Sequence, residues 1–293
     1  MDEPNPHSEW RLKLARTLAP AYISQPGVAA AAVCGSVARG WADRYSDVEL
    51  AVWWHRVPTA EDRARCVRRI AESSERRDLG YKPDLDAWNE DFLASGMKVD
   101  VRHSTVDGQD RLLAQVVDAH DTSVAGQQSV AEVVHAVGLH GADLLDRWRQ
   151  RADPYPDGLA RAMVEANLRF GPNAWIERLA ERDDVLPLAE ISVTVVRAVF
   201  GVLLGLNRIY HPGYKWMDRT LASMTIRTTG LPVRVRTVLE NPVRTRVAEL
   251  ERLVEDTIRL VEQEAPEIDT TAVRARVDTP ARIWEGPPRV PPG

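Results

Sequence analysis

The chain has 293 residues, of which 44% are hydrophobic, so it is long and apolar enough to bury a core and suggests two domains. Its formal net charge of −5 provides no general basic field for nucleic acid. The longest apolar run, residues 193–206, falls short of the ~18 residues that cross a bilayer and contains Arg197. Cys34 and Cys66 fall in a strand end and a charged helix, so we expect no disulfide and a cytoplasmic protein without membrane association.

The first part of the chain predicts a helix followed by two short strands. Residues 8–23 carry apolar side chains at helical spacing, and a Gln-Pro-Gly turn ends this helix. An apolar strand over residues 28–34 leads into the Gly35-Ser36 turn, and the apolar run over residues 47–53 predicts the next strand. These two strands and the turn between them carry the candidate site.

Two acidic residues, Asp47 and Glu49, stand in the second predicted strand. Successive side chains of a strand point to opposite faces, so these carboxylates share one face while Val48, Leu50 and Val52 point into a core. Like charges on one face repel each other unless a cation lies between them. Carboxylate oxygens at this spacing suit Mg²⁺, which keeps several waters and takes its remaining ligands from substrate phosphates.

The Gly35-Ser36 turn predicts a place for those phosphates. Glycine has no Cβ, so a phosphate can approach the backbone N–H groups closely, and the Ser36 hydroxyl adds a donor. A turn that opens a short helix also presents a positive dipole end. A phosphate site beside two carboxylates is typical of phosphoryl or nucleotidyl transfer.

The stretch GSVARGWADRYSDVEL, residues 35–50, resembles the signature of the polymerase-β-like nucleotidyltransferase superfamily. The shared features are Gly-Ser, a spacer of about ten residues and an Asp-x-Glu between apolar residues, and Arg39-Gly40 and Ser46 match as well. The chain is most similar to the small-molecule branch, which includes the aminoglycoside and lincosamide nucleotidyltransferases. The resemblance is specific over about the first hundred residues and looser over the rest. It implies an α+β fold, with an N-terminal catalytic domain built on a mixed β-sheet flanked by helices and an all-α domain after it.

The resemblance also requires a third strand with a third carboxylate. A charged helix is expected over residues 58–77, and residues 97–103 alternate as a strand should, which places Asp100 at the third position. In related enzymes this residue completes the metal site or takes the proton from the acceptor hydroxyl. Asp84 and Asp86 compete for the role, but the proline before them weakens a central-strand interpretation, so we expect them at an edge or in a loop.

The second half predicts helices throughout. A polar gap near residues 122–127 suggests the domain boundary, and the helix over residues 186–209 is apolar nearly all round, as expected for the buried axis of a helical domain. The expected domains are a catalytic domain over residues 1–124, a helical domain over residues 125–285 and a flexible tail over residues 286–293. The remaining predicted helices cover residues 110–119, 129–149, 156–170, 173–182, 221–239 and 242–265, with one more turn in 272–284.

A second group of candidate binding residues follows the apolar helix. Pro212-Gly213 forces a turn that projects Tyr214, Lys215 and Trp216 to one side. A lysine between two aromatic residues suits a triphosphate, and either aromatic ring suits stacking on a base. The segment also resembles one that faces the cleft in bacterial nucleotidyltransferases, so Tyr214 and Lys215 are predicted to bind nucleotide together with Gly35, Ser36 and Arg39.

The expected function is Mg²⁺-dependent transfer of a nucleoside monophosphate, AMP from ATP in the first instance, to a hydroxyl of a small molecule, with release of pyrophosphate. The resemblance implies an aminoglycoside- or lincosamide-like antibiotic, with resistance as the role, or a specialised metabolite. Asp47, Glu49 and Asp100 are the predicted catalytic and metal-binding residues, and Asp100, Glu165 and Glu190 are alternatives for the general base. Two other functions stay open: nucleotidylation of a protein or tRNA, as in toxin–antitoxin systems, and a non-catalytic nucleotide-binding regulator. The chain carries no basic stripe for tRNA.

Overall fold

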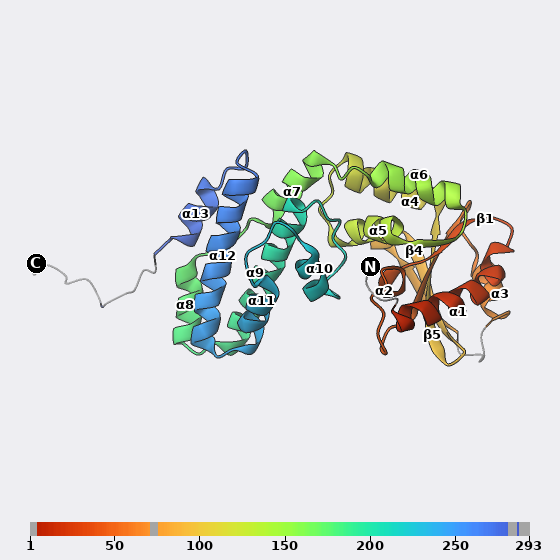
Figure 1. The fold of residues 1–293 in the computed structure, drawn as a ribbon, viewed down its shortest axis with the longest axis horizontal. Coiled ribbons are helices and arrows are strands. Elements are labelled where there is room, and N and C mark those ends of the chain that lie inside the picture. The colour runs from red at the N-terminus through yellow and green to blue at the C-terminus, as the bar shows by residue number, and fades with distance from the viewer. Residues whose placement is uncertain (1–4, 71–75, 281–285, 287–293) are drawn as a thin grey trace, which may run out of the picture. The chain divides into compact units, whose positions relative to one another are not determined.

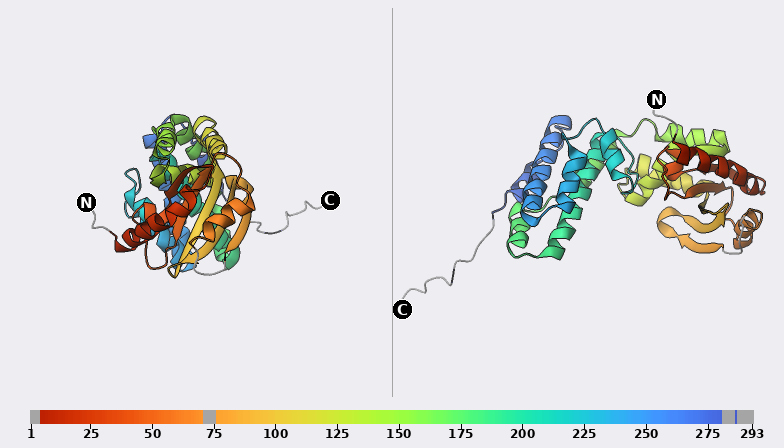
Figure 2. Two further views of the ribbon diagram at one scale, coloured as in Figure 1. Left: turned by 90° about the vertical axis from the view of Figure 1, so that its right-hand side faces the viewer. Right: turned by 60° about the horizontal axis from the view of Figure 1, so that its bottom comes forward.

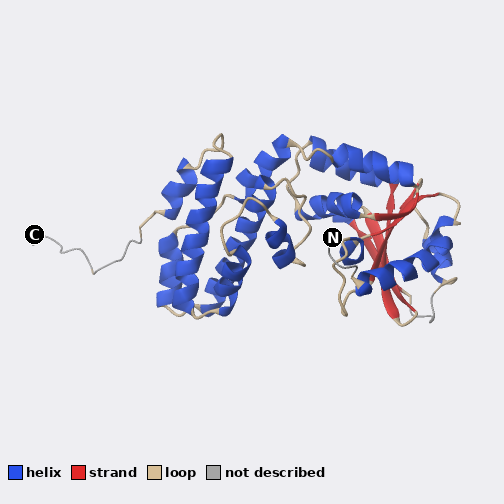
Figure 3. Ribbon diagram, in the orientation of Figure 1, coloured by secondary structure: helices blue, strands red, loops and turns tan. Residues whose placement is uncertain are grey.

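The computed structural model describes residues 5–70, 76–280 and 286 of the chain. It divides into two compact units, the first made of Met1–Leu159 with Tyr210–Lys215 and the second of Ala160–Ile209 with Trp216–Gly293. Figure 3 shows the strands gathered in the first unit, whereas the described part of the second is built from helices and loops. The α+β fold expected from the sequence is confirmed.

The first unit is built on a six-stranded mixed sheet, whose strands lie in the order β3-β4-β5-β2-β1-β6. Figure 1 labels β1, β4 and β5 of this sheet. Its central pair, β2 and β5, is parallel, and the neighbouring pairs are antiparallel. The strands are β1 (Val28–Val33), β2 (Val48–Trp54), β3 (Arg77–Lys82), β4 (Ala87–Ala94), β5 (Met97–Thr105) and β6 (Val137–His140).

One face of the sheet carries the hydrophobic core of the unit. The helices α1 (Pro6–Ile23) and α3 (Ala60–Val67) lie on this side, and the right-hand view of Figure 2 shows α1 along the sheet. Val48, Leu50 and Val52 point into this core, as their alternation predicts, together with residues of β5 such as Val99. The core face therefore takes alternate residues of the central strands and leaves their polar neighbours on the other face.

The opposite face is covered by α4 (Val106–Leu113), α5 (Val124–His135) and α6 (Ala142–Ala152), and the π-helical turn Ala114–Asp118 follows α4. Trp53 on β2 packs against Trp148 on α6, with ring centroids 5.2 Å apart. The Trp53 Nε1–H donates to Gln109 Oε1 at 3.1 Å, so this buried ring keeps a hydrogen-bond partner.

The N-terminus of α1 fixes the loop that leads to Asp47. Asn5 is the N-cap: its side-chain oxygen accepts from the backbone of the first turn, and its amide donates to the carbonyl oxygens of Gly40 and Ala42 at 3.0 and 2.8 Å. The buried Arg11 donates from Nε to the carbonyl oxygen of Ser46 at 2.8 Å. These bonds hold the short helix α2 (Gly35–Ala38) and the following loop against α1.

Two stretches expected to be continuous helices are broken by strands. The charged helix predicted over residues 58–77 is wrong at its end, because α3 ends at Val67 and Arg77 begins the edge strand β3. The β3–β4 hairpin, with a 3₁₀ turn at Pro83–Leu85, was not expected from the sequence. The helix predicted over residues 129–149 is likewise wrong, because β6 lies between α5 and α6 and pairs with β1.

The pairing of β6 with β1 also keeps α5 and α6 with the sheet, so the first compact unit extends to Leu159. The expected boundary after residue 124 falls at the first residue of α5, Val124. Local sequence shows a polar gap there, whereas the strand pairing that joins α5 and α6 to the sheet depends on contacts about a hundred residues apart.

The second unit is organised around α9 (Val185–Leu206), whose buried residues face α8, α11 and α12. By length and composition α9 is the one helix in the described chain that could cross a membrane, longer than the apolar run expected from the sequence. However, 61% of its apolar window is buried inside the protein, as in the core helix of a helical domain. The other helices are α7 (Asp157–Asn167), α8 (Asn173–Glu181), α10 (Met217–Ser223), α11 (Leu231–Glu240), α12 (Val243–Glu264) and α13 (Thr271–Val277).

Candidate functional site

Asp47 and Asp100 meet at the start of the central parallel strands. Glu49 is directly opposite Asp100 in the β2–β5 register, and the side chains of Asp47 and Asp100 are hydrogen-bonded to each other. The Lys98 Nζ donates to both carboxylate oxygens of Asp100, at 2.5 and 2.6 Å, and lies 3.5 Å from Asp47 Oδ2. Two of the three predicted carboxylates therefore converge, and a lysine ammonium supplies the positive charge beside them.

The pKa values of the pair move in opposite directions. Burial by itself raises the pKa of Asp47, but the hydrogen bond with Asp100 and the charge of Lys98 outweigh it and leave that pKa below its ordinary value. Burial and the bond with Asp47 raise the pKa of Asp100, against the opposing effect of Lys98. Asp100 is thus the member of the pair that holds a proton more readily.

A further carboxylate that sequence reasoning missed, Asp91, belongs to the same cluster. It is buried on β4, directly opposite Asp100. The Arg77 guanidinium binds both of its oxygens, at 2.7 and 2.5 Å, and the Lys98 Nζ lies 3.8 Å from Asp91 Oδ2. Asp91 could have been found only by predicting β4, because the residue is placed by its pairing with β5.

Glu49 is directed toward the Gly35 turn. Gly35 has a φ of +62°, and a Cβ at this position would lie 1.3 Å from Glu49 Oε2. Only glycine can therefore stand beneath this carboxyl. Burial raises the pKa of Glu49 to about 7, reinforced by the charges of Glu132 and Asp47 and opposed by Lys215. Within the described residues no hydrogen bond reaches this carboxyl.

The predicted phosphate site at Gly35-Ser36 therefore has a carboxyl beside it in this structure. Both residues lie in α2, where Ser36 is buried, and Cys34 before them makes no side-chain cap. The Glu49 carboxyl occupies the space above the Gly35 Cα, so the binding of phosphate at this turn stays a prediction. Cys34 and Cys66 are buried free thiols, as expected.

Arg39, at the end of α2, stands near the same carboxyls. Its guanidinium lies over the Trp41 ring, 5.2 Å from the ring centroid. Burial lowers the pKa of Arg39, while the charges of Glu132 and Glu49 oppose this effect. The Arg39 side chain is half-buried. Within residues 35–50 it is the cation whose charge interacts with Glu49.

The segment Tyr210–Lys215 belongs to the first unit although it follows α9 in the chain. Tyr210 donates its hydroxyl hydrogen to the carbonyl oxygen of Ala152 at 2.8 Å, and the His211 N–H donates to Gln127 Oε1 at 3.0 Å. These two anchors tie the segment to α6 and α5. Its remaining residues are thereby held close to the sheet.

The turn within this segment is rigid. The Gly213 N–H donates to His211 Nδ1 at 2.9 Å. Gly213 has a φ of +85°, and a Cβ at this position would lie 2.5 Å from the side-chain amide nitrogen of Gln128. Tyr214 packs edge-on against His211 at 4.9 Å. The exposed Lys215 then lies where its charge lowers the pKa of both Asp47 and Glu49. Lys215 therefore acts on the acidic cluster although it lies more than 160 residues after Asp47 and Glu49 in the sequence.

Asp86 has its partners outside this cluster. Asp86 accepts from the Tyr81 hydroxyl at 2.7 Å and pairs with Arg111 at 2.5 Å, while the backbone of Asp84 lies in the 3₁₀ turn. Glu165 and Glu190, the alternative bases, are exposed residues of the second unit, and Glu165 pairs with Arg161 at 2.7 Å. Their role as bases stays a prediction.

A pocket of about 250 Å³ opens beside the carboxyls on the helix-covered face of the sheet. Its charged lining residues are Glu49, Glu90, Asp100, Arg102 and Glu132. Glu132, on α5, is ion-paired with Arg102 and was not recognised from the sequence, because α5 was expected in the other domain. Among the described residues, no group of three or more His, Cys, Asp or Glu side chains is arranged to hold a metal ion.

Comparison with known proteins gives limited guidance. Residues 124–217 match the family model of a domain of unknown function, DUF4037, which covers less than half of the chain. This stretch contains Glu132 and the Tyr210–Lys215 segment. No curated protein matches the chain.

Among solved structures, the chain is similar to a nucleotidyltransferase-like protein from Exiguobacterium sibiricum 255-15. The two are 12% identical, the match covers 87% of this chain and 78% of the other, and the TM-score is 0.38. A likeness this loose carries no argument about activity, so the functional proposal has to stand on the residues of the site.

Proposed function

We propose that this chain is a nucleotidyltransferase that moves a nucleoside monophosphate, AMP from ATP in the first instance, to a hydroxyl group of a small molecule and releases pyrophosphate. One observation carries the proposal. Asp47 and Asp100 are hydrogen-bonded to each other at the start of the central parallel strands, Glu49 stands opposite Asp100 and against the Gly35 turn, and Lys215 and Arg39 are nearby cations. Carboxylates that burial and like charges hold at unusual pKa values are typical of functional sites.

Asp47 and Asp100 fit a divalent cation. Their carboxylates approach each other within hydrogen-bond reach, and Lys98 already provides a positive charge beside them. Mg²⁺ binds through one or two carboxylates together with substrate phosphates, so two protein ligands are enough. Mg²⁺ held by Asp47 and Asp100 would supply charge compensation for the triphosphate. Glu49 stays a predicted third ligand, although its carboxyl lies against Gly35 here.

The chain's own residues account for phosphate binding and for the proton. Lys215 and Arg39 bind the phosphates, because they are the cations whose charges reach Glu49. The acceptor hydroxyl attacks the α-phosphorus and the bond to pyrophosphate breaks, while Glu49 takes the hydroxyl proton. We assign this proton to Glu49 rather than to Asp100, because both Asp100 oxygens already accept from Lys98, whereas no hydrogen bond within the described residues reaches the Glu49 carboxyl.

The test is to incubate the protein with Mg²⁺ and labelled ATP, GTP, CTP or UTP, together with aminoglycosides, lincosamides, neutral sugars, proteins and tRNA. Pyrophosphate release and labelled product identify both substrates. Asp47→Asn is expected to lower turnover by on the order of 10³-fold, since one side of the metal site is lost, while the protein stays folded because asparagine has the same size and can still hydrogen-bond to Asp100.

Asp86→Asn is the matched control, since Asp86 is an acidic residue of the same unit whose partners are Tyr81 and Arg111. It should keep its turnover. Near wild-type activity of Asp47→Asn, or equal losses in both variants, would contradict the assignment of the site.

A further inference from the structure

Four charged side chains form one row across the sheet. Asp91 is the direct partner of Arg77 on β3 and of Asp100 on β5, and Asp100 is in turn the direct partner of Glu49 on β2. Residues that are directly opposite each other on neighbouring strands lie on the same face of a sheet. Asp91 and Asp100 are therefore neighbours on one face, with Arg77 on the outer side of Asp91.

Lys98 stands beside this row, two residues before Asp100 on the same strand and therefore on the same face. Its Nζ lies 2.5 and 2.6 Å from the two Asp100 oxygens, 3.5 Å from Asp47 Oδ2 and 3.8 Å from Asp91 Oδ2. Burial by itself lowers the pKa of Lys98, but the bond with Asp100 and the charges of all three carboxylates outweigh it and raise that pKa. The ammonium is thus held by three acidic residues, most closely by Asp100.

The metal pair of the proposed function, Asp47 and Asp100, offers the same oxygens to a divalent cation. An ammonium and a divalent cation at contact distance from one carboxylate repel each other strongly. Binding of Mg²⁺ therefore requires Lys98 to withdraw from Asp100. The Lys98 side chain is 42% exposed, so it has room to move.

Asp91 is placed to receive the ammonium. It is the one of the three carboxylates that lies outside the proposed metal pair, and its side chain is only 5% exposed, with both oxygens bound by Arg77 at 2.7 and 2.5 Å. These features make it a poor metal ligand. A charge-assisted N–H···O bond is about 2.7–2.9 Å long, so Lys98 Nζ needs to come only about 1 Å closer to Asp91 Oδ2. A carboxylate oxygen has two lone pairs and can accept from Arg77 and Lys98 together.

We propose that Asp91 is a positioning residue of the metal site, which acts through Lys98. Without a divalent cation Lys98 bonds to Asp100, and when the cation binds to Asp47 and Asp100 the ammonium moves to Asp91. Arg77 holds the Asp91 carboxyl in place for this exchange. The inference rests on the metal pair of the proposed function, but it does not depend on the transfer of a nucleotide.

The experiment measures Mg²⁺ binding by calorimetry, without nucleotide, in wild type, Asp91→Asn, Lys98→Met and the double variant. Asp91→Asn should weaken Mg²⁺ binding about fivefold, because the ammonium has no second carboxylate to move to and stays at Asp100. In the Lys98→Met background the same substitution should change Mg²⁺ binding by less than about twofold, because the residue through which Asp91 acts is gone. A metal ligand, or a carboxylate that acts only through its general charge, would weaken binding equally in both backgrounds, and this result would overturn the inference.

A second variant guards against loss of the fold in Asp91→Asn. The Arg77 side chain is 67% exposed, so Arg77→Gln should stay folded. Asp91 then attracts Lys98 more strongly, because its other cation is lost. Arg77→Gln should therefore tighten Mg²⁺ binding more when Lys98 is present than in the Lys98→Met background, and an equal effect in both would contradict the exchange.

Asp86→Asn is the matched control, because Asp86 is also bound by an arginine, Arg111, with its partners outside the cluster. It should leave Mg²⁺ binding unchanged in both backgrounds. Absence of Mg²⁺ binding in wild type and in every variant would also overturn the inference. Failure of the proposed function would show itself separately, as the expected pattern of Mg²⁺ binding without pyrophosphate release.

Discussion

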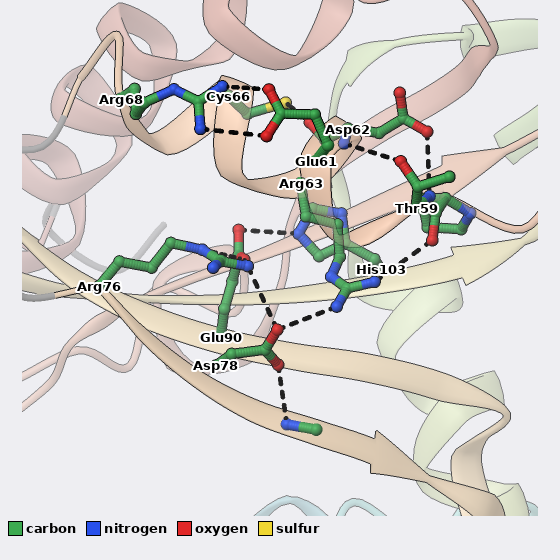
Figure 4. A network of polar contacts seen from close by, with 12 residues as sticks. Thr59, Glu61, Asp62, Arg63, Cys66, Arg68, Arg76, Asp78, Glu90 and His103 are labelled. Carbon is green, nitrogen blue, oxygen red and sulfur yellow. Dashed lines mark hydrogen bonds and ion pairs between the residues drawn. The ribbon is translucent and has the colours of Figure 1, made fainter.

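Two glutamates on neighbouring parts of the same sheet have opposite environments. Asp91 shares the face of Glu49, since both stand beside Asp100, so Glu90 points to the other side, into the core. Arg76 donates to Glu90 Oε2 at 2.8 and 2.6 Å, and the ring of His103 contacts Glu90 Oε1 at 3.0 Å (Figure 4). Burial alone raises the pKa of Glu90, but His103 and Arg76 outweigh it, and the pKa lies below its ordinary value.

His103 is itself fixed by a third residue. The Trp54 Nε1–H, which can only donate, contacts His103 Nδ1 at 3.1 Å. His103 must therefore accept at Nδ1 and carry its proton on Nε2, facing Glu90. Every member of this network has a partner. Glu49, by contrast, has other carboxyls around it and a pKa raised to about 7.

The difference teaches how one sheet serves two purposes. On the core face a buried charge is neutralised by partners that the chain supplies, so removing one partner destabilises the fold. On the helix-covered face, several carboxyls lie close together without full compensation of their charge. This arrangement costs stability, and it suits a site that binds a cation and a phosphate. Four predictions test this comparison.

The largest effect is expected from removing the core charge. Glu90→Gln should lower the free energy of unfolding by about 3–5 kcal/mol, because it breaks the ion pair of a fully buried carboxylate and leaves Arg76 only its longer contact with Asp78, at 3.5 Å. Denaturant unfolding of wild type, Glu90→Gln and Glu49→Gln makes the measurement. Equal losses in the two variants would erase the distinction between the faces.

The pH dependence of Glu49 is the next test. Its pKa is raised from 4.5 to about 7 in the folded protein, so the carboxyl is stabilising in its protonated form. Its contribution is fully present below pH 4.5 and is lost as the pH rises through about 7, a loss of roughly 3 kcal/mol for a shift of this size. Glu49→Gln should remove this dependence when unfolding is measured without divalent cations. A wild type whose stability is flat over this window would contradict it.

Lys98 tests the acidic cluster with a smaller effect. Lys98→Met should lower stability by about 1 kcal/mol without metal, because the side chain is partly exposed, and should bind Mg²⁺ more tightly, because its ammonium no longer competes. Melting temperatures with and without Mg²⁺ report both effects. Lys13→Met, on the exposed surface of α1, is the control. If Mg²⁺ raises the melting temperature of Lys98→Met no more than that of wild type, Lys98 does not stand in for the metal.

The smallest effect is expected at Lys215. Lys215→Ala should raise the KM for nucleotide about fivefold, close to 1 kcal/mol, with little change in stability, because the side chain is exposed. The effect should shrink at high salt, since exposed charges are screened. Steady-state kinetics at two ionic strengths gives both values, with Lys82→Ala as the control. Unchanged nucleotide kinetics would leave Lys215 as a surface residue of a turn.

The sequence by itself determined the local parts of this protein. The alternation of Asp47 and Glu49 with Val48 and Leu50 fixed which side chains enter the core, and the Gly35 turn and the Asp100 strand followed from patterns only a few residues long. The apolar axis helix of the second half was recognised for the same reason.

Only the tertiary structure determined which residues lie beside these side chains. Asp91 and Asn89 reach the site through strand register, Glu132 arrives on a helix that β6 attaches to the sheet, and Lys215 arrives on a segment anchored to α5. Side-chain direction along a strand repeats every two residues and can be read locally. Pairing between strands is set by the packing of the whole sheet, so no short stretch of sequence contains it.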